Sequence, residues 1–153
     1  MTLMEILSDK SVIVGLKGES KREILEELVD ALEVGDKIVD REKVLDTVLL
    51  REEIMSTGIG HGIAIPHGKS EFVTELGGVL GIKSSGVEFD ALDGKPTYIF
   101  FLLVSPMDVS GPHIKALARI SRLLKGEDFR QQLISVADNE SAIAIIEAEE
   151  KRH

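Results

Sequence analysis

The sequence contains no cysteine and no tryptophan, and aromatic residues make up only 4% of its 153 positions. Without cysteine, the chain can form no disulfide, no thiolate zinc site and no cysteine nucleophile. It also has no apolar run long enough to cross a bilayer, and no charged-then-apolar signal at its N-terminus. These absences favour a soluble, cytoplasmic protein with no direct membrane insertion.

The charge balance narrows the class of partner. Eighteen basic and 27 acidic residues give a formal net charge of −9. A nucleic-acid partner would need a basic face that replaces counterions on phosphates, so the balance predicts no nucleic-acid binding. The negative net charge is explained by solubility alone, or by binding to a basic partner. The length and the 43% apolar content predict one domain covering residues 1–153.

Apolar periodicity and turn residues predict helices and strands in alternation along the chain. Ser20, with Glu23 three residues on, is a capping box for a helix that stops at Gly35, and Asp40 caps the next helix. The apolar run from Tyr98 to Val104 is typical of a central strand covered on both faces. The pattern predicts an α/β layer fold with a mixed sheet. The other expected strands are 11–14, 63–65, 79–82 and 87–90, and the other expected helices are 110–126, 128–136 and 139–150.

The stretch from Thr57 to Gly68 is the most informative in the chain. It holds four glycines, one proline and two histidines. The glycines permit positive φ and a close approach by another molecule. Ile63 to Ile65 is apolar and predicts a short buried strand, which Pro66 should end because proline donates no ladder hydrogen bond. His67 is then expected where the strand meets a glycine turn, with one face of its imidazole open.

His67, His113 and Arg51 together suggest a phosphate site. His113 follows Gly111-Pro112, so it belongs to the first turn of a helix, where unpaired N–H groups and the macrodipole favour an anion. Arg51 lies at the edge of a buried helical stripe, near the helix end. A neutral imidazole at His67 has a lone pair available for a phosphoryl group, and the resulting N–P bond is readily cleaved. Arg51 could supply fixed charge, and His113 could donate a hydrogen bond to a phosphoryl oxygen.

Other interpretations of the same residues stay open. His113 could cap its own helix, and Arg51 could be a surface cation whose stem packs on the core. His61 is better explained as a bystander, and His153 as a solvated terminal residue. Zinc could bind a set formed by His61, His67 and His113, although no tight ligand spacing is present. A purely structural or binding module would carry no phosphoryl group at all.

The segment from Gly58 to His67 resembles the active-site signature of a known family. These are the IIA domains of the bacterial phosphoenolpyruvate-dependent sugar phosphotransferase system, fructose/mannitol type, including the nitrogen-regulatory IIA branch. Arg51-Glu52 matches the family's arginine position, and the segment 113–120 resembles its second histidine segment. The resemblance extends over nearly the whole chain.

This resemblance implies a phosphoryl carrier with a mixed β-sheet sandwiched by α-helices, and no metal or organic cofactor. His67 would accept a phosphoryl group from the phosphohistidine of the carrier HPr and pass it to the cysteine of a IIB component. His113 and Arg51 would stabilise the phosphoryl group, and His61 would have no catalytic role. The acidic balance suits docking onto HPr, whose binding face is basic in that family. A nitrogen-regulatory IIA would use the same chemistry to control other proteins, and the sequence does not identify a sugar.

Overall fold

The computed structural model describes residues 3–7, 11–108 and 110–152. No helix within these ranges is both long enough and apolar enough to span a membrane. The helices are α1 (Leu3–Ile6), α2 (Lys21–Val34), α3 (Arg41–Ile54), α4 (Ser110–Leu123), α5 (Glu127–Ser135) and α6 (Asn139–Lys151). The strands are β1 (Val12–Val14), β2 (Gly58–Gly60), β3 (Ile63–Ala64), β4 (His67–Lys69), β5 (Gly77–Val87) and β6 (Thr97–Ser105).

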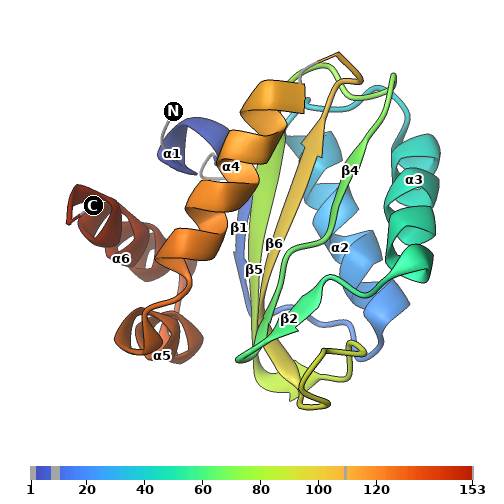
Figure 1. Ribbon diagram of the computed structural model, residues 1–153. Coiled ribbons are helices and arrows are strands. Elements are labelled where there is room, and N and C mark those ends of the chain that lie inside the picture. The colour runs from blue at the N-terminus through green and yellow to red at the C-terminus, as the bar shows by residue number, and fades with distance from the viewer. Residues whose placement is uncertain (1–2, 8–10, 109, 153) are drawn as a thin grey trace.

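These strands form a mixed six-stranded sheet in the order β1–β5–β6–β3–β2, with β4 also pairing to β6. β5 and β6 are antiparallel, whereas β1 runs parallel to β5. β3 and β4 follow one another along the same edge of β6, and both run parallel to it. Helices α2 and α3 cover one face of the sheet, and α4, α5 and α6 cover the other (Figure 1).

The central strand β6 divides the core into two parts. Ile99, Phe101 and Leu103 belong to the cluster beneath α4, α5 and α6. The alternate residues Phe100, Leu102 and Val104 belong to the cluster beneath α2 and α3. Successive side chains of a strand point to opposite faces, so a strand between two helical layers must be apolar throughout. The predictions of a mixed α/β fold and of a central strand near 98–104 are confirmed.

The predicted helix starts are also confirmed. The Ser20 hydroxyl accepts a hydrogen bond from the backbone N–H of Glu23 at 3.2 Å. The Asp40 carboxylate accepts one from the N–H of Lys43 at 3.1 Å. Each cap pairs one of the N–H groups that the first helical turn leaves open. Gly35 closes α2, as expected.

Two strand predictions are wrong. The segment 87–90 is no separate strand, because β5 continues from Gly77 to Val87 and ends there. The apolar residue Phe89 is explained by packing in the core, where its ring lies against that of Phe100 with centroids 5.3 Å apart. The strand before Pro66 ends as predicted, but His67 does not enter the expected glycine turn. The Pro66 carbonyl accepts a hydrogen bond from Leu103, so the chain stays beside β6 and resumes as β4 at His67.

Candidate functional site

His67 is the first residue of β4, and its side chain is half-buried. Its Nδ1 lies 2.9 Å from the backbone carbonyl oxygen of Ile65. A carbonyl oxygen can only accept, so Nδ1 carries the proton and Nε2 keeps its lone pair. Ile65 lies between β3 and β4, where its N–H donates to the carbonyl of Thr57 and its carbonyl faces the ring of His67. The local backbone therefore leaves His67 with one nucleophilic nitrogen, Nε2.

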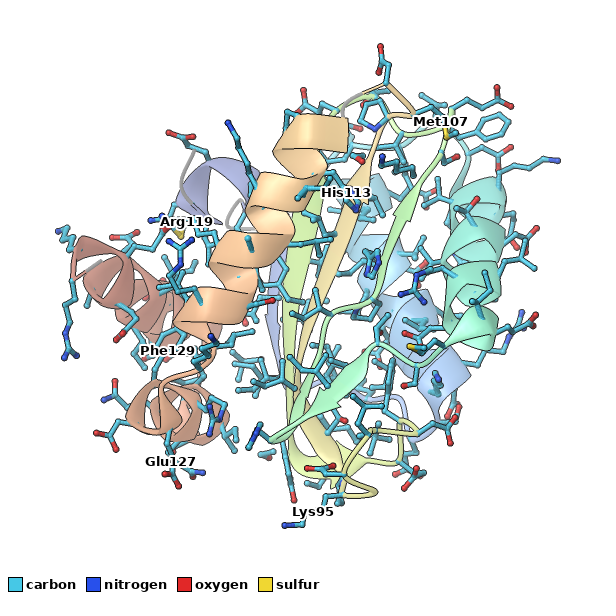
Figure 2. All side chains as sticks on the ribbon, viewed as in Figure 1. Lys95, Met107, His113, Arg119, Glu127 and Phe129 are labelled. Carbon is cyan, nitrogen blue, oxygen red and sulfur yellow. The ribbon has the colours of Figure 1, made fainter. Side chains whose placement is uncertain are left out.

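His113 extends from α4 toward β6, on the side of the helix opposite Arg119 (Figure 2). It is only 4% exposed, and its Nδ1 lies 2.7 Å from the hydroxyl oxygen of Ser105 at the end of β6. The rings of His113 and His67 lie edge to face, with centroids 5.8 Å apart and planes at 62°. The structure thus brings together His67 and His113, which are far apart in the sequence.

Arg51 lies in the last turn of α3, and its guanidinium donates a hydrogen bond to the carbonyl of Met55 at 2.9 Å. This bond holds the guanidinium at the C-terminal end of α3. Within the described residues the guanidinium makes no other hydrogen bond or ion pair. Since a guanidinium has five N–H donors, most of them remain available to an anion. Its charge also acts on His67.

The pKa values of both histidines are lowered, mainly by burial. For His67, the charge of Arg51 lowers the pKa further, whereas the Ile65 carbonyl and the Glu52 carboxylate raise it. For His113, burial lowers the pKa to about 4, and His67 and Lys69 add to the effect. Both imidazoles are therefore neutral at pH 7, which keeps a lone pair on His67 and leaves His113 with one N–H donor.

Glu52 is a residue whose place in the site the sequence did not predict. Its side chain is buried, forms a 2.7 Å ion pair with Lys21, and accepts hydrogen bonds from the N–H and hydroxyl of Thr57. These bonds join the end of α3, next to Arg51, to the start of the glycine-rich stretch. The burial of a charged residue such as Glu52 cannot be predicted from its own helix, because the partners that make it possible, Lys21 and Thr57, belong to other segments.

His61 lies apart from the other two histidines. It is exposed, has a φ of 58°, and occupies the turn between β2 and β3, where its N–H donates to Asp93. β3 pairs with Ile99, whereas His67 pairs with Leu103, so the turn is displaced from His67 by about 15 Å along β6. Among the described residues no group of three or more histidine or acidic side chains is placed to hold a metal ion. A zinc site that combines His61 with His67 and His113 is therefore not formed.

The lowered pKa of His113 has a measurable consequence for stability. A histidine with a folded-state pKa of about 4 and an unfolded value of about 6.5 binds more protons when unfolded. The free energy of unfolding should therefore rise as the pH increases from about 4 to 6.5, with His113 contributing up to about 3 kcal/mol. Urea unfolding across this range, compared with a His113→Asn variant, isolates the contribution. Equal slopes for the two proteins would contradict the buried, neutral state of His113.

Chemically, the arrangement pairs a neutral nitrogen nucleophile with a fixed cation and a second imidazole. The model of the family described as "Phosphoenolpyruvate-dependent sugar phosphotransferase system, EIIA 2" matches residues 5–149. The chain belongs to this family. The match covers all three candidate residues, and the mixed α/β fold agrees with it.

Relatives of this IIA protein carry two kinds of name. The fructose-specific EIIABC component of Bacillus subtilis is 32% identical over 151 residues, which are 99% of this chain but 24% of that protein. The nitrogen regulatory protein of Bradyrhizobium diazoefficiens is 31% identical over 147 residues, and the match covers 95% of each chain. The crystal structure of nitrogen regulatory protein IIA-Ntr from Neisseria meningitidis has a TM-score of 0.86 at 31% identity. That match covers 93% of this chain and 97% of the other.

Proposed function

We propose that this IIA protein is a cytoplasmic phosphoryl carrier in which His67 is the acceptor. It takes the group from the phosphohistidine of an HPr-like phosphocarrier and passes it to the cysteine of a IIB component. We extend the proposal to residues 1–153 as one such domain. The observation that carries it is the His67 ring, whose Nδ1 donates to the Ile65 carbonyl and whose Nε2 is unprotonated beside Arg51 and His113.

The transfer balances without an added proton. The Nε2 lone pair of His67 attacks phosphorus in line as the N–P bond of the donor breaks, and the donor ring, protonated on its other nitrogen, leaves as a neutral imidazole. The phosphorylated ring is an imidazolium, and its Nδ1–H is already paired with the Ile65 carbonyl. When a thiolate then attacks phosphorus, the N–P bond breaks and His67 leaves as a neutral imidazole. The carbonyl of Ile65 thus supports the charged intermediate and leaves the nucleophile free in the resting state.

Arg51 and His113 stabilise charge on the transferring group. Arg51 has unused guanidinium donors near His67, and its hydrogen bond to the Met55 carbonyl holds the guanidinium in place. His113 is neutral and buried, so it contributes a hydrogen bond without adding a second full charge. Fixed donors in a partly dry site stabilise a developing negative charge more strongly than water does. The pair would therefore assist both arrival and departure of the phosphoryl group.

The surface around these residues suits a protein partner. Large apolar side chains are exposed next to Arg51 and His113 along the chain, where a carrier would have to dock. They are Leu50, Ile54, Met55 and Ile114, with exposed fractions of 62%, 81%, 64% and 64%. Large exposed apolar side chains of this kind are typical of protein–protein contact sites.

A second candidate function uses the same histidine. Two relatives that match this chain over about 95% of their length are named nitrogen regulatory proteins, whereas the fructose-specific EIIABC component of Bacillus subtilis is about four times longer than this chain. A regulatory IIA would signal through its phosphorylation state instead of supplying a transporter. Both candidates share the step in which His67 is phosphorylated.

Incubation of the purified chain with phosphoenolpyruvate, enzyme I and HPr tests that shared step. With labelled phosphoenolpyruvate, we expect an acid-labile label on the chain that depends on both added proteins. A chase with a fructose- or mannitol-type IIB domain should then remove the label if the chain supplies transport. Label that IIB cannot remove would favour the regulatory function, and the absence of any label would reject both candidates.

A further inference from the structure

Ser105 makes a hydrogen bond whose direction has a consequence for the site. It is the last residue of β6, it is fully buried, and its hydroxyl oxygen lies 2.7 Å from Nδ1 of His113. Leu103, two residues earlier, points into the core beneath α4, so the strand's period of two directs Ser105 to the same face. β6 also pairs with β4 at this point, with Leu103 opposite His67. One strand therefore holds Ser105 against His113 and positions His67.

A hydroxyl can donate or accept, and burial decides between the two. Within the described residues, Ser105 Oγ has no other hydrogen-bond partner. If Nδ1 of His113 carried the proton, the hydroxyl hydrogen of Ser105 would be buried without an acceptor, which is unfavourable. If the hydroxyl donates to Nδ1, only lone pairs of the oxygen remain unused, which is less costly. The favoured arrangement has the proton of His113 on Nε2.

We propose that Ser105 is a positioning residue that holds His113 in its Nε2–H tautomer, so that His113 is a hydrogen-bond donor to the phosphoryl group. The second half of this statement rests on the proposed function of His67. A neutral imidazole in the other tautomer would turn a lone pair toward the phosphoryl oxygens and repel them. The orientation of one buried hydroxyl thus decides whether His113 stabilises or opposes the transferring group.

The tautomer can be measured without any phosphoryl transfer. In protein labelled with ¹⁵N-histidine, two-bond ¹H–¹⁵N correlation spectra at pH 7 distinguish a protonated from an unprotonated ring nitrogen. We expect wild-type His113 to have a protonated Nε2 and an unprotonated Nδ1. In Ser105→Ala, the Nδ1–H tautomer should become populated, whereas Ser105→Thr should retain the wild-type pattern because it keeps the hydroxyl. A protonated Nδ1 in wild type would overturn the proposal, and this test needs no variant that folds.

The effect on transfer is a separate measurement. Transfer from phosphorylated Ser105→Ala to a IIB domain should be about tenfold slower than from wild type, and Ser105→Thr should restore most of the rate. An unchanged rate despite an altered tautomer would overturn the link between Ser105 and the phosphoryl group. If wild type takes no label from phospho-HPr, the proposed function fails, but the tautomer result still decides what Ser105 does to His113.

Discussion

His67→Ala should take no label from phospho-HPr, whereas wild type is labelled. The expected loss is complete because no other nitrogen in the site can replace Nε2 of His67. His113 is only 4% exposed, and its Nδ1 is occupied by Ser105. The side chain of Arg51 is always protonated and therefore has no lone pair to offer. The measurement is acid-labile radioactivity on the purified chain after incubation with phosphoenolpyruvate, enzyme I and HPr.

His61→Ala is the matched control for this experiment. It removes a histidine from the same glycine-rich stretch, but from an exposed turn about 15 Å away along β6. It should be labelled like wild type. Both variants should unfold cooperatively in urea, which shows that the loss in His67→Ala comes from the missing nucleophile. Undiminished labelling of His67→Ala would reject this residue as the acceptor.

His113→Ala should still accept label but pass it on about 100-fold more slowly to a IIB domain. Removal of one preorganised donor to a developing negative charge costs about 10²–10³ in rate in other enzymes. His113 is such a donor in the proposed mechanism, in which Ser105 holds its ring 5.8 Å from that of His67. Rapid-quench measurement of label moving from the phosphorylated chain to IIB gives the rate directly.

Lys115→Ala provides the comparison on the same helix, because Lys115 is exposed and lies two residues beyond His113. It should transfer label at a rate within a factor of two or so of wild type. If His113→Ala discharged as fast as this control, His113 would have only a structural role. If folded His113→Ala took no label at all, its role as a helper of His67 would also be wrong.

Much of the fold was predictable because local signals and tertiary packing agree. Ser20 and Asp40 cap helices where the spacing predicted, and the continuous apolar run near 98–104 could be stable only between two helical layers. The failures occurred where packing replaced a local pattern. Phe89 is buried against Phe100 without being part of a strand. The absence of a donor at Pro66 predicted a strand end. The Pro66 carbonyl nevertheless accepts a hydrogen bond from the N–H of Leu103, so the chain stays beside β6 and His67 begins a new strand.

The candidate residues themselves were identified from residue type and position, yet their states were not. Neither the neutral charge of His113 nor the burial of Glu52 follows from local spacing. Both depend on desolvation by segments that are distant in the sequence. No local pattern singles out Ser105; its hydroxyl acquires a role only because α4 places His113 beside it.

The sequence by itself determined the alternation of helices and strands, the family signature from Gly58 to His67, and the absence of a thiol in the chain. Only the tertiary structure decided which nitrogen of His67 is free, which histidine lies beside it, and that His61 does not. The reason is that periodicity and capping act over a few residues. Tautomer, pKa and donor geometry are instead set by groups from β6, α3 and α4 that meet only when the sheet and its two helical layers have formed.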